Sequence, residues 1–164
     1  MVRARGDYPA HLRRPPDAVY HPPMIRIGVF SKPLDNWISG SGHHLNEILA
    51  HALDLDAEER RFDFTFIHYR KSDNPIYSRV RELIIPRNPL AAAAALRRHR
   101  FDVLHHGPLT IFSPIWFTRA KRMATIHGVE QLLNPHFYWA LEMAHERWVV
   151  PFYARRMDAI VTVS

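Results

Sequence analysis

The chain has 164 residues, of which 47% are hydrophobic and 23% are charged, and its formal net charge is +6. This composition is typical of a globular domain and excludes a chain that is disordered throughout. The sequence contains no cysteine, which excludes a disulfide scaffold, a thiolate zinc site and a cysteine nucleophile. No apolar run approaches the length of a membrane-spanning helix, and the first residues lack the apolar core of a signal peptide. We therefore expect a cytoplasmic protein, with the inner membrane surface as the alternative location.

The excess of positive charge is spread thinly along the chain. Residues 1–23 carry four Arg and two Asp, which is +2 and leaves +4 for the other 141 residues. Without a Lys/Arg block or an aromatic-basic pattern, the sequence predicts no nucleic-acid partner; it favours a phosphate-bearing ligand or an anionic membrane surface. Residues 1–23 also hold five of the 13 prolines and no apolar period. They are predicted to be a disordered tail before a domain at 24–164.

Strand-like and helix-like patterns alternate from Met24 onward. The apolar runs predict six strands, at 25–30, 62–69, 83–85, 102–106, 122–126 and 159–163. Helical spacing predicts one helix from His43, one from Pro89 to about Arg98, and a long one from Asn134 to about Met157 that Pro151 kinks. Residues 31–42 are predicted to be a loop, and 111–118 a short helix or turn.

Continuous apolar strands that alternate with helices indicate an α/β fold with a mainly parallel sheet covered on both faces. Right-handed crossovers make this a doubly wound, Rossmann-like layer. Ligands of such sheets bind beyond the carboxyl ends of the strands. The residues that follow the strands here are rich in Gly and His, a composition that a core would not supply.

The segment Gly40-Ser41-Gly42 joins the first strand to the first helix. Glycine lets a ligand approach the backbone closely, and the amino end of the following helix offers N–H groups and a partial positive charge. These three residues are therefore predicted to bind a diphosphate. The alternative is a flexible turn.

Histidines follow the strands at several places. His127, after the fifth strand, is a candidate proton acceptor or sugar-hydroxyl ligand, with Glu130 to assist it; the alternative is a structural histidine. Strand alternation sends His105 and His106 to opposite faces, and His106 is predicted to bind substrate. His44 is predicted to do the same, against the alternative of a solvated first helical turn. Adjacent histidines diverge and the spacing of the ligands is wrong for a metal, so no metal site is predicted.

Residues 138–157 carry several aromatic side chains in a helical pattern. The simpler interpretation is a helix packed on the sheet. The alternative is a peripheral membrane contact through Trp148 and the neighbouring Arg147, Arg155 and Arg156.

Five segments in order carry a resemblance to a known family: IRIGVF at 25–30, GSGHHLNEILAHAL at 40–53, FDVLHHGPL at 101–109, RMATIHGVE at 122–130 and MDAIVTVS at 157–164. Together they resemble the N-terminal domain of GT-B glycosyltransferases of the large retaining family four. That family usually has Gly-Gly before the first helix, whereas here Ser41 takes the second place and Gly42 follows.

The resemblance implies transfer of a sugar, of the hexosyltransferase type, from a nucleotide-sugar to an acceptor that is a sugar, a lipid or a small molecule. The nucleotide-sugar is a co-substrate, and no cofactor is implied. Gly40 and Gly42 would lie against the donor diphosphate, and His127 near the transferred sugar. In the family, the basic residues and the Glu-x7-Glu element that hold the donor lie in a second, C-terminal domain.

We expect that donor domain to be absent from this chain, which is then a truncated product, a fragment or one half of a split enzyme completed by a partner chain. The isolated chain is accordingly expected to have negligible transferase activity. The alternative from a different class is a non-catalytic Rossmann-like module that binds a nucleotide or a sugar.

Overall fold

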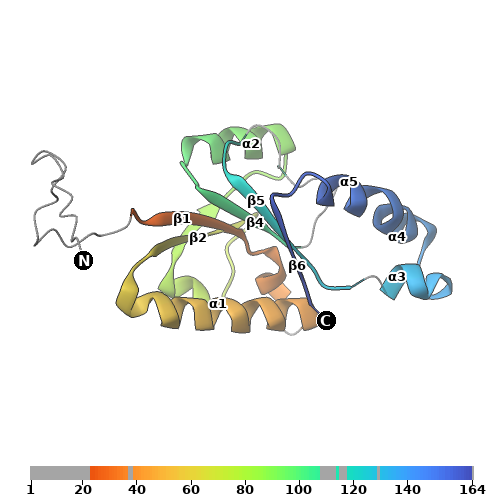
Figure 1. Cartoon of the computed structure of the whole chain (residues 1–164), viewed down its shortest axis with the longest axis horizontal. Coiled ribbons are helices and arrows are strands. Elements are labelled where there is room, and N and C mark those ends of the chain that lie inside the picture. The colour runs from red at the N-terminus through yellow and green to blue at the C-terminus, as the bar shows by residue number, and fades with distance from the viewer. Residues whose placement is uncertain (1–22, 37–38, 108–113, 115–117, 129, 164) are drawn as a thin grey trace, which may run out of the picture.

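A single parallel β-sheet of six strands organises the chain (Figure 1). The computed structural model describes residues 23–36, 39–107, 114, 118–128 and 130–163. The spatial order of the strands is β3-β2-β1-β4-β5-β6, and every pairing is parallel. The strands are β1 (Ile25–Phe30), β2 (Phe62–His68), β3 (Arg81–Ile84), β4 (Val103–His106), β5 (Lys121–Ile126) and β6 (Ala159–Thr162).

This strand order confirms the predicted Rossmann-like α/β fold. The chain winds outward from β1 to β3, returns to the middle, and winds outward again from β4 to β6. The direction of winding therefore reverses between β1 and β4, and a crevice beyond the carboxyl ends of these two strands is where such sheets bind ligands.

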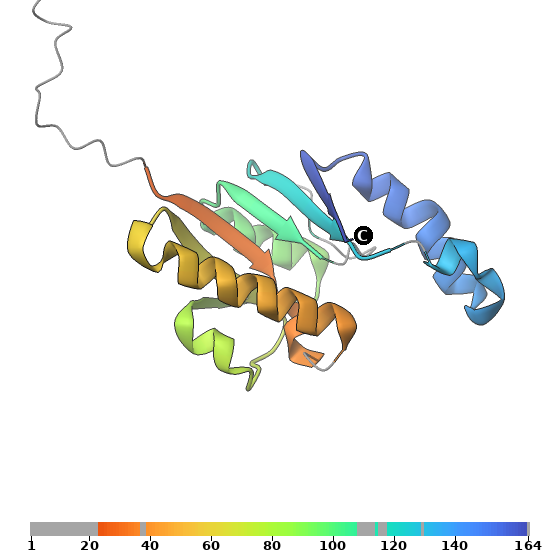
Figure 2. The same ribbon diagram turned by 60° about the horizontal axis from the view of Figure 1, so that its bottom comes forward.

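Helices cover the two faces of the first half of the sheet. The long helix α1 (Gly40–Glu59) lies on one face and α2 (Pro89–Arg98) on the other, as Figure 2 shows with α1 in front. Two short 3₁₀ helices, η2 (Lys32–Asn36) and η3 (Pro75–Arg79), follow β1 and β2. The helix predicted at 89–98 is confirmed. It starts at Pro89 because the side-chain oxygen of Asn88 accepts the N–H groups of Leu90 and Ala91.

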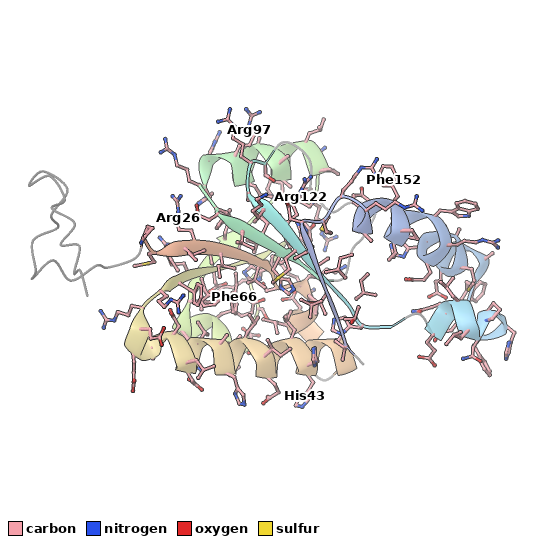
Figure 3. All side chains as sticks on the ribbon, in the orientation of Figure 1. Arg26, His43, Phe66, Arg97, Arg122 and Phe152 are labelled. Carbon is pink, nitrogen blue, oxygen red and sulfur yellow. The ribbon has the colours of Figure 1, made fainter. Side chains whose placement is uncertain are left out.

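Each face has its own apolar core. Alternation along β1 sends Val29 to the α1 face and Phe30 to the α2 face, and both are buried. The α1 core is made of Val29, Leu34, Leu45, Leu49, Phe66, Ile76 and Tyr77. The α2 core is made of Phe30, Ile67, Ile85, Ala92, Leu96 and Leu104. Figure 3 labels Phe66 in the layer between β2 and α1.

Two carboxylates bind backbone N–H groups at the amino-terminal edge of the sheet, opposite the edge where the strands end. Asp102 accepts the backbone N–H of Arg26 at 2.8 Å and pairs with the guanidinium of the same residue at 3.2 Å. Asp158 accepts the backbone N–H of Arg122 at 2.8 Å in the same manner. The hydrogen bonds lower the pKa of both carboxyl groups. Figure 3 labels Arg26 on β1 and Arg122 on β5.

The prediction of one long helix from Asn134 is wrong, because the segment is divided into several short helices. The structure has α3 (Glu130–Leu133), η4 (Pro135–Phe137), α4 (Ala140–Ala144), the π-helical turn η5 (His145–Val149) and α5 (Val150–Ala154). Asn134 makes no side-chain cap, and Tyr138 and Trp139 are extended, so the helix starts again at Ala140.

Pro151 explains why the helix is interrupted a second time, between α4 and α5. Pro151 has no N–H, and its ring clashes with the carbonyl four residues before it in a regular α-helix. The π-helical turn η5 ends immediately before α5, where the N–H of Val150 donates to the carbonyl of His145, five residues back. A π-helical turn thus lies just upstream of Pro151, where the sequence predicted a kink.

The first helix begins earlier than predicted, at Gly40 instead of His43, because Ser39 caps it. The predicted strands are confirmed within one or two residues at each end. The tail at 1–22 lies outside the described residues, as does most of the helix or turn predicted at 111–118. Among the described residues, no helix combines the length and apolar character needed to span a bilayer.

Candidate functional site

The amino end of α1 is a capped helix terminus that lies at the carboxyl edge of the sheet. Ser39 has extended backbone angles, and its hydroxyl accepts the N–H of Gly42 at 3.2 Å. Gly40, Ser41 and Gly42, predicted as a loop, therefore form the first turn of the helix. The N–H groups of a first turn have no partner within the helix and point out of its end.

Neither backbone conformation nor crowding requires glycine at position 40. The described part of the chain has no glycine with positive φ, and a Cβ built on Gly40 meets no atom within 4 Å. Gly128, after β5, has the same open surroundings. Gly28 on β1 differs, because a Cβ there would lie 2.7 Å from Leu104 and 2.8 Å from Ile67. Packing therefore crowds position 28 and leaves Gly40 and Gly128 open to an approaching ligand.

His44 and His127 meet at this end of α1. Their ring centroids are 5.4 Å apart and the rings are nearly perpendicular, in an edge-to-face contact. His44 is two residues beyond Gly42 on α1, and His127 directly follows β5. The structure thus brings two of the predicted site residues together and places both beside the predicted diphosphate segment. Both side chains are half-buried.

Burial, and then the neighbouring His44, lower the pKa of His127. Behind it lies His105, which is 8% exposed and whose Nε2 is 2.8 Å from the Oγ1 of Thr125. Burial, and then His127, lower the pKa of His105 to about 4. An uncharged imidazole can accept a hydrogen bond or a proton, and the lowered pKa values favour this uncharged form in His127 and His105.

His106, predicted to bind substrate, lies on the other face. It is 1% exposed, and its ring stacks on Phe30 at 4.4 Å among the α2-side residues. Burial is also the main reason why its pKa falls to about 3. The residue that joins the cluster is His105, the neighbour on the opposite face. The register could have identified it, because His105 pairs with Val29 and so shares the face of α1.

Glu130, which was predicted to assist His127, does not join the cluster. Glu130 begins α3 and is exposed, and the described residues show no hydrogen bond or ion pair between it and His127. His43 is exposed on the outer side of α1, away from the sheet (Figure 3). Asp102 precedes β4 whereas His127 follows β5, so these two residues stand at opposite edges of the sheet. In the described part of the chain, no group of three or more His, Asp or Glu side chains could hold a metal ion.

A polar cavity opens on the same edge of the sheet, next to the amino half of α1. Asn74 links the cavity to α1, because its side-chain N–H donates to the side-chain oxygen of Asn46 at 3.2 Å. The cavity has a volume of about 400 Å³. Its lining residues come from the segments after β1 and β2 and are Leu34, Asp35, Arg70, Lys71, Ser72, Asp73 and Asn74.

A buried histidine lies behind this cavity. His68 is fully buried, and its Nε2 is 3.0 Å from a carboxylate oxygen of Glu82. Its Nδ1 is 3.9 Å from Asp35, which also lines the cavity and faces Arg70 at 3.9 Å. The ring stacks on Tyr77 at 4.6 Å. The cavity therefore presents both charge signs and many hydrogen-bonding groups, which suit a hydroxyl-rich ligand.

Fold and site together define a Rossmann-like domain that has a helix amino terminus, a histidine cluster and a polar cavity at the carboxyl edge of its sheet. A sequence model of glycosyltransferase family 4 matches residues 36–164, which is most of the chain and includes the amino end of α1 and the histidine cluster. The chain belongs to glycosyltransferase family 4. Comparisons with curated proteins and with solved structures give no significant match.

Proposed function

We propose that this chain is the acceptor-side half of a retaining GT-B glycosyltransferase, which transfers a sugar from a nucleotide-sugar to an acceptor when a second domain completes the site. The observation that carries the proposal is the contact of His44 with His127 at the amino end of α1, beside the reversal point of the sheet. A helix amino terminus and a hydrogen-bond acceptor for a sugar hydroxyl thereby lie within one ligand's reach.

In this proposal the first turn of α1 binds the donor diphosphate. The N–H groups and the helix dipole favour negative charge, and they favour it most when the leaving group takes up the charge of the broken glycosidic bond. Gly40 allows the phosphate to approach the backbone, since its surroundings are open. His127, whose pKa is lowered by burial and by His44, accepts a hydrogen bond from the transferred sugar.

The acceptor is proposed to occupy the polar cavity after β1 and β2. Asp35 and Arg70 offer an acceptor and a donor for hydroxyl groups there. The groups that complete the donor site are proposed to come from a second domain or a partner chain.

The test is a thermal-shift titration of the purified chain with UDP-sugars and GDP-sugars. Gly40→Val fills the open space at the first turn and is expected to weaken binding at least about tenfold, since it separates the phosphate from the helix amides. Ala91→Val is the control, because it places the same β-branched side chain in the first turn of α2. His127→Phe is expected to weaken binding of the sugar nucleotide, whereas His43→Phe, on the outer side of α1, leaves binding unchanged.

Three outcomes would contradict the proposal. The first is a wild-type chain that none of these nucleotide-sugars shifts, and the second is equal binding by Gly40→Val and Ala91→Val. The third is turnover by the isolated chain, which would remove the need for a second domain. Binding by the chain that never becomes turnover, even with a donor-domain partner added, identifies the alternative, a non-catalytic binding module.

A further inference from the structure

The polar cavity after β1 and β2 contains one carboxylate that is largely enclosed. The side chain of Asp35, on η2, is 12% exposed, whereas that of Arg70, which also lines the cavity, is 70% exposed. Oδ1 of Asp35 is buried and accepts no hydrogen bond from the described residues. The nitrogens beside it stay beyond hydrogen-bond distance, because Nδ1 of His68 is 3.9 Å from Oδ1 and Nε of Arg70 is 3.9 Å from Oδ2. A buried carboxylate oxygen is unfavourable unless a donor group reaches it, so Asp35 offers a ligand a strong acceptor.

His68, behind Asp35, is held in a fixed position. Its ring stacks on Tyr77 with the ring centroids 4.6 Å apart and an angle of 12° between the planes. The hydroxyl of Tyr77 in turn donates to Oγ of Ser31 at 3.0 Å. Nε2 of His68 lies 3.0 Å from a carboxylate oxygen of Glu82, and Nδ1 faces Asp35 on the other side. A fixed ring that carries a proton on Nδ1 attracts the carboxylate of Asp35 and favours one position for it.

The rest of the lining favours a neutral ligand with many hydroxyl groups. Asp35 and Asp73 supply two carboxylates to the cavity. Arg70 and Lys71 supply two cations, so the formal charges of the lining sum to zero. Leu34 is the one apolar lining residue, and an acyl chain in this cavity would desolvate charged groups without replacing their hydrogen bonds. Hydroxyl groups both donate and accept, so a ligand that carries several of them serves the carboxylates and the cations at once.

We propose that the cavity binds the acceptor through a neutral sugar ring or a similar polyol, which donates a hydroxyl hydrogen bond to Asp35, and that His68 positions Asp35 for this contact. The proposal rests on the proposed function, because it names the class of acceptor for the site proposed there. His68 is a positioning residue, since its side chain is fully buried and acts on the ligand only through Asp35.

The first experiment titrates the full chain with glucose, galactose and mannose, followed by saturation-transfer NMR. At least one of these hexoses is expected to bind with a dissociation constant on the order of 1 mM. Its affinity should change little between about 0.05 M and 0.5 M salt, because neither the ligand nor the lining has a net charge. Asp35→Asn is expected to weaken binding at least about fivefold, as it replaces a charged acceptor by a neutral amide. Glu58→Gln, which removes an exposed carboxylate of α1, is the control and should leave binding unchanged.

The second experiment tests the positioning role. His68→Phe keeps an aromatic ring against Tyr77 but removes both ring nitrogens, and it is expected to weaken hexose binding about threefold to tenfold. In the Asp35→Asn background the same change should have no further effect on binding, because the interaction through which His68 acts is already lost. His106→Phe is the matched control, since His106 is also buried and stacks on Phe30 on the other face of the sheet. It should leave hexose binding unchanged.

A measurement on the wild-type chain covers the case in which His68→Phe unfolds. With isotope-labelled histidine, a bound hexose should shift the ring signals of His68, although the ring does not touch the ligand, and should leave those of His106 in place. The same shift should be absent in Asp35→Asn. A His68 ring that does not respond to a hexose that binds would overturn the positioning role, as would additive effects of His68→Phe and Asp35→Asn on affinity.

The proposed class of ligand is overturned if none of the three hexoses binds, or if Asp35→Asn and Glu58→Gln bind them equally. It is also overturned if a hexose binds only as its phosphate monoester or as its amino-sugar derivative, which would show that the cavity requires a charge. Failure of the proposed function gives a different result, because thermal shifts by UDP-sugars and GDP-sugars report on the amino end of α1. These shifts should be the same in the wild-type chain, Asp35→Asn and His68→Phe.

Discussion

At the scale of single residues, the two glycines at 28 and 40 have different roles. Gly28 lies where β1 passes closest to Leu104 and Ile67, both fully buried. Gly40 has open space around it although it lies in the first turn of a helix. One added methyl group should therefore destabilise the chain at position 28 and should not destabilise it at position 40.

We predict that Gly28→Ala lowers the free energy of unfolding by about 1–3 kcal/mol, because the methyl group forces two packed side chains to move. The loss outweighs the roughly 0.4–1 kcal/mol that alanine gains by restricting the unfolded chain. Gly40→Ala is expected to be neutral or to stabilise the protein by up to about 1 kcal/mol, as alanine favours the helix. Urea unfolding of both variants checks this, and equal effects would contradict it.

The buried histidines His105 and His106 make stability depend on pH. Their pKa values in the folded chain are about 4 and about 3, against 6.5 for an unperturbed ring, and burial is the main cause. Below pH 6.5 the unfolded chain therefore binds more protons than the folded chain. The free energy of unfolding falls as the pH drops through this window, by at most about 1.4 kcal/mol per pH unit and per histidine.

We predict that His106→Leu reduces this acid loss, because it removes a buried ring whose Nε2 makes no hydrogen bond within the described residues. Stability at pH 7 should change little, since leucine has a similar volume and an apolar surface. Thermal unfolding between pH 4 and 7.5 measures the effect, with His43→Leu on exposed α1 as control. A His106→Leu variant that keeps its nucleotide-sugar affinity assigns the residue to packing, and one that loses this affinity restores it to the site.

At the scale of elements, apolar runs predicted the strands and the fold class, because a parallel strand that is buried on both faces leaves a clear pattern. The start of α1 was missed because glycine disfavours helix, so Gly40-Ser41-Gly42 was taken as a loop. The signal was present as Ser39, whose side chain caps the N–H three residues on. His127 was chosen as a candidate by its place after a strand, but the faces on which His105 and His106 lie could be assigned only from the strand register.

The helical segment after β5 could not be predicted in detail because two local rules compete there. Asn134-Pro135 is a normal helix start in sequence, yet Glu142 binds the backbone N–H of Trp139, and α4 begins at that second start. Periodicity also could not show which aromatic residues face water, because an apolar stripe has the same spacing whether it covers a sheet or stands free. Tyr153 packs on the sheet and Trp148 does not.

At the scale of the whole molecule, buried apolar contacts are distributed unevenly across the sheet. The central strands β1, β2 and β4 lie between two apolar cores. The far side depends on a small cluster around Ala124 and Tyr153, and every residue of the edge strand β6 is exposed. Stability follows buried apolar contact, so the outer helices α3, α4 and α5 and the strand β6 should open without unfolding of the centre.

Hydrogen exchange followed by mass spectrometry tests this. We predict that amides of α3, α4 and α5 exchange about tenfold to a hundredfold faster than those of β1, β2 and β4, because their local opening exposes little apolar surface. The half of α1 near Leu45 and Leu49 is the internal reference, since the same core holds both residues. Uniform protection along the chain would show that the outer helices and the central sheet unfold as one unit.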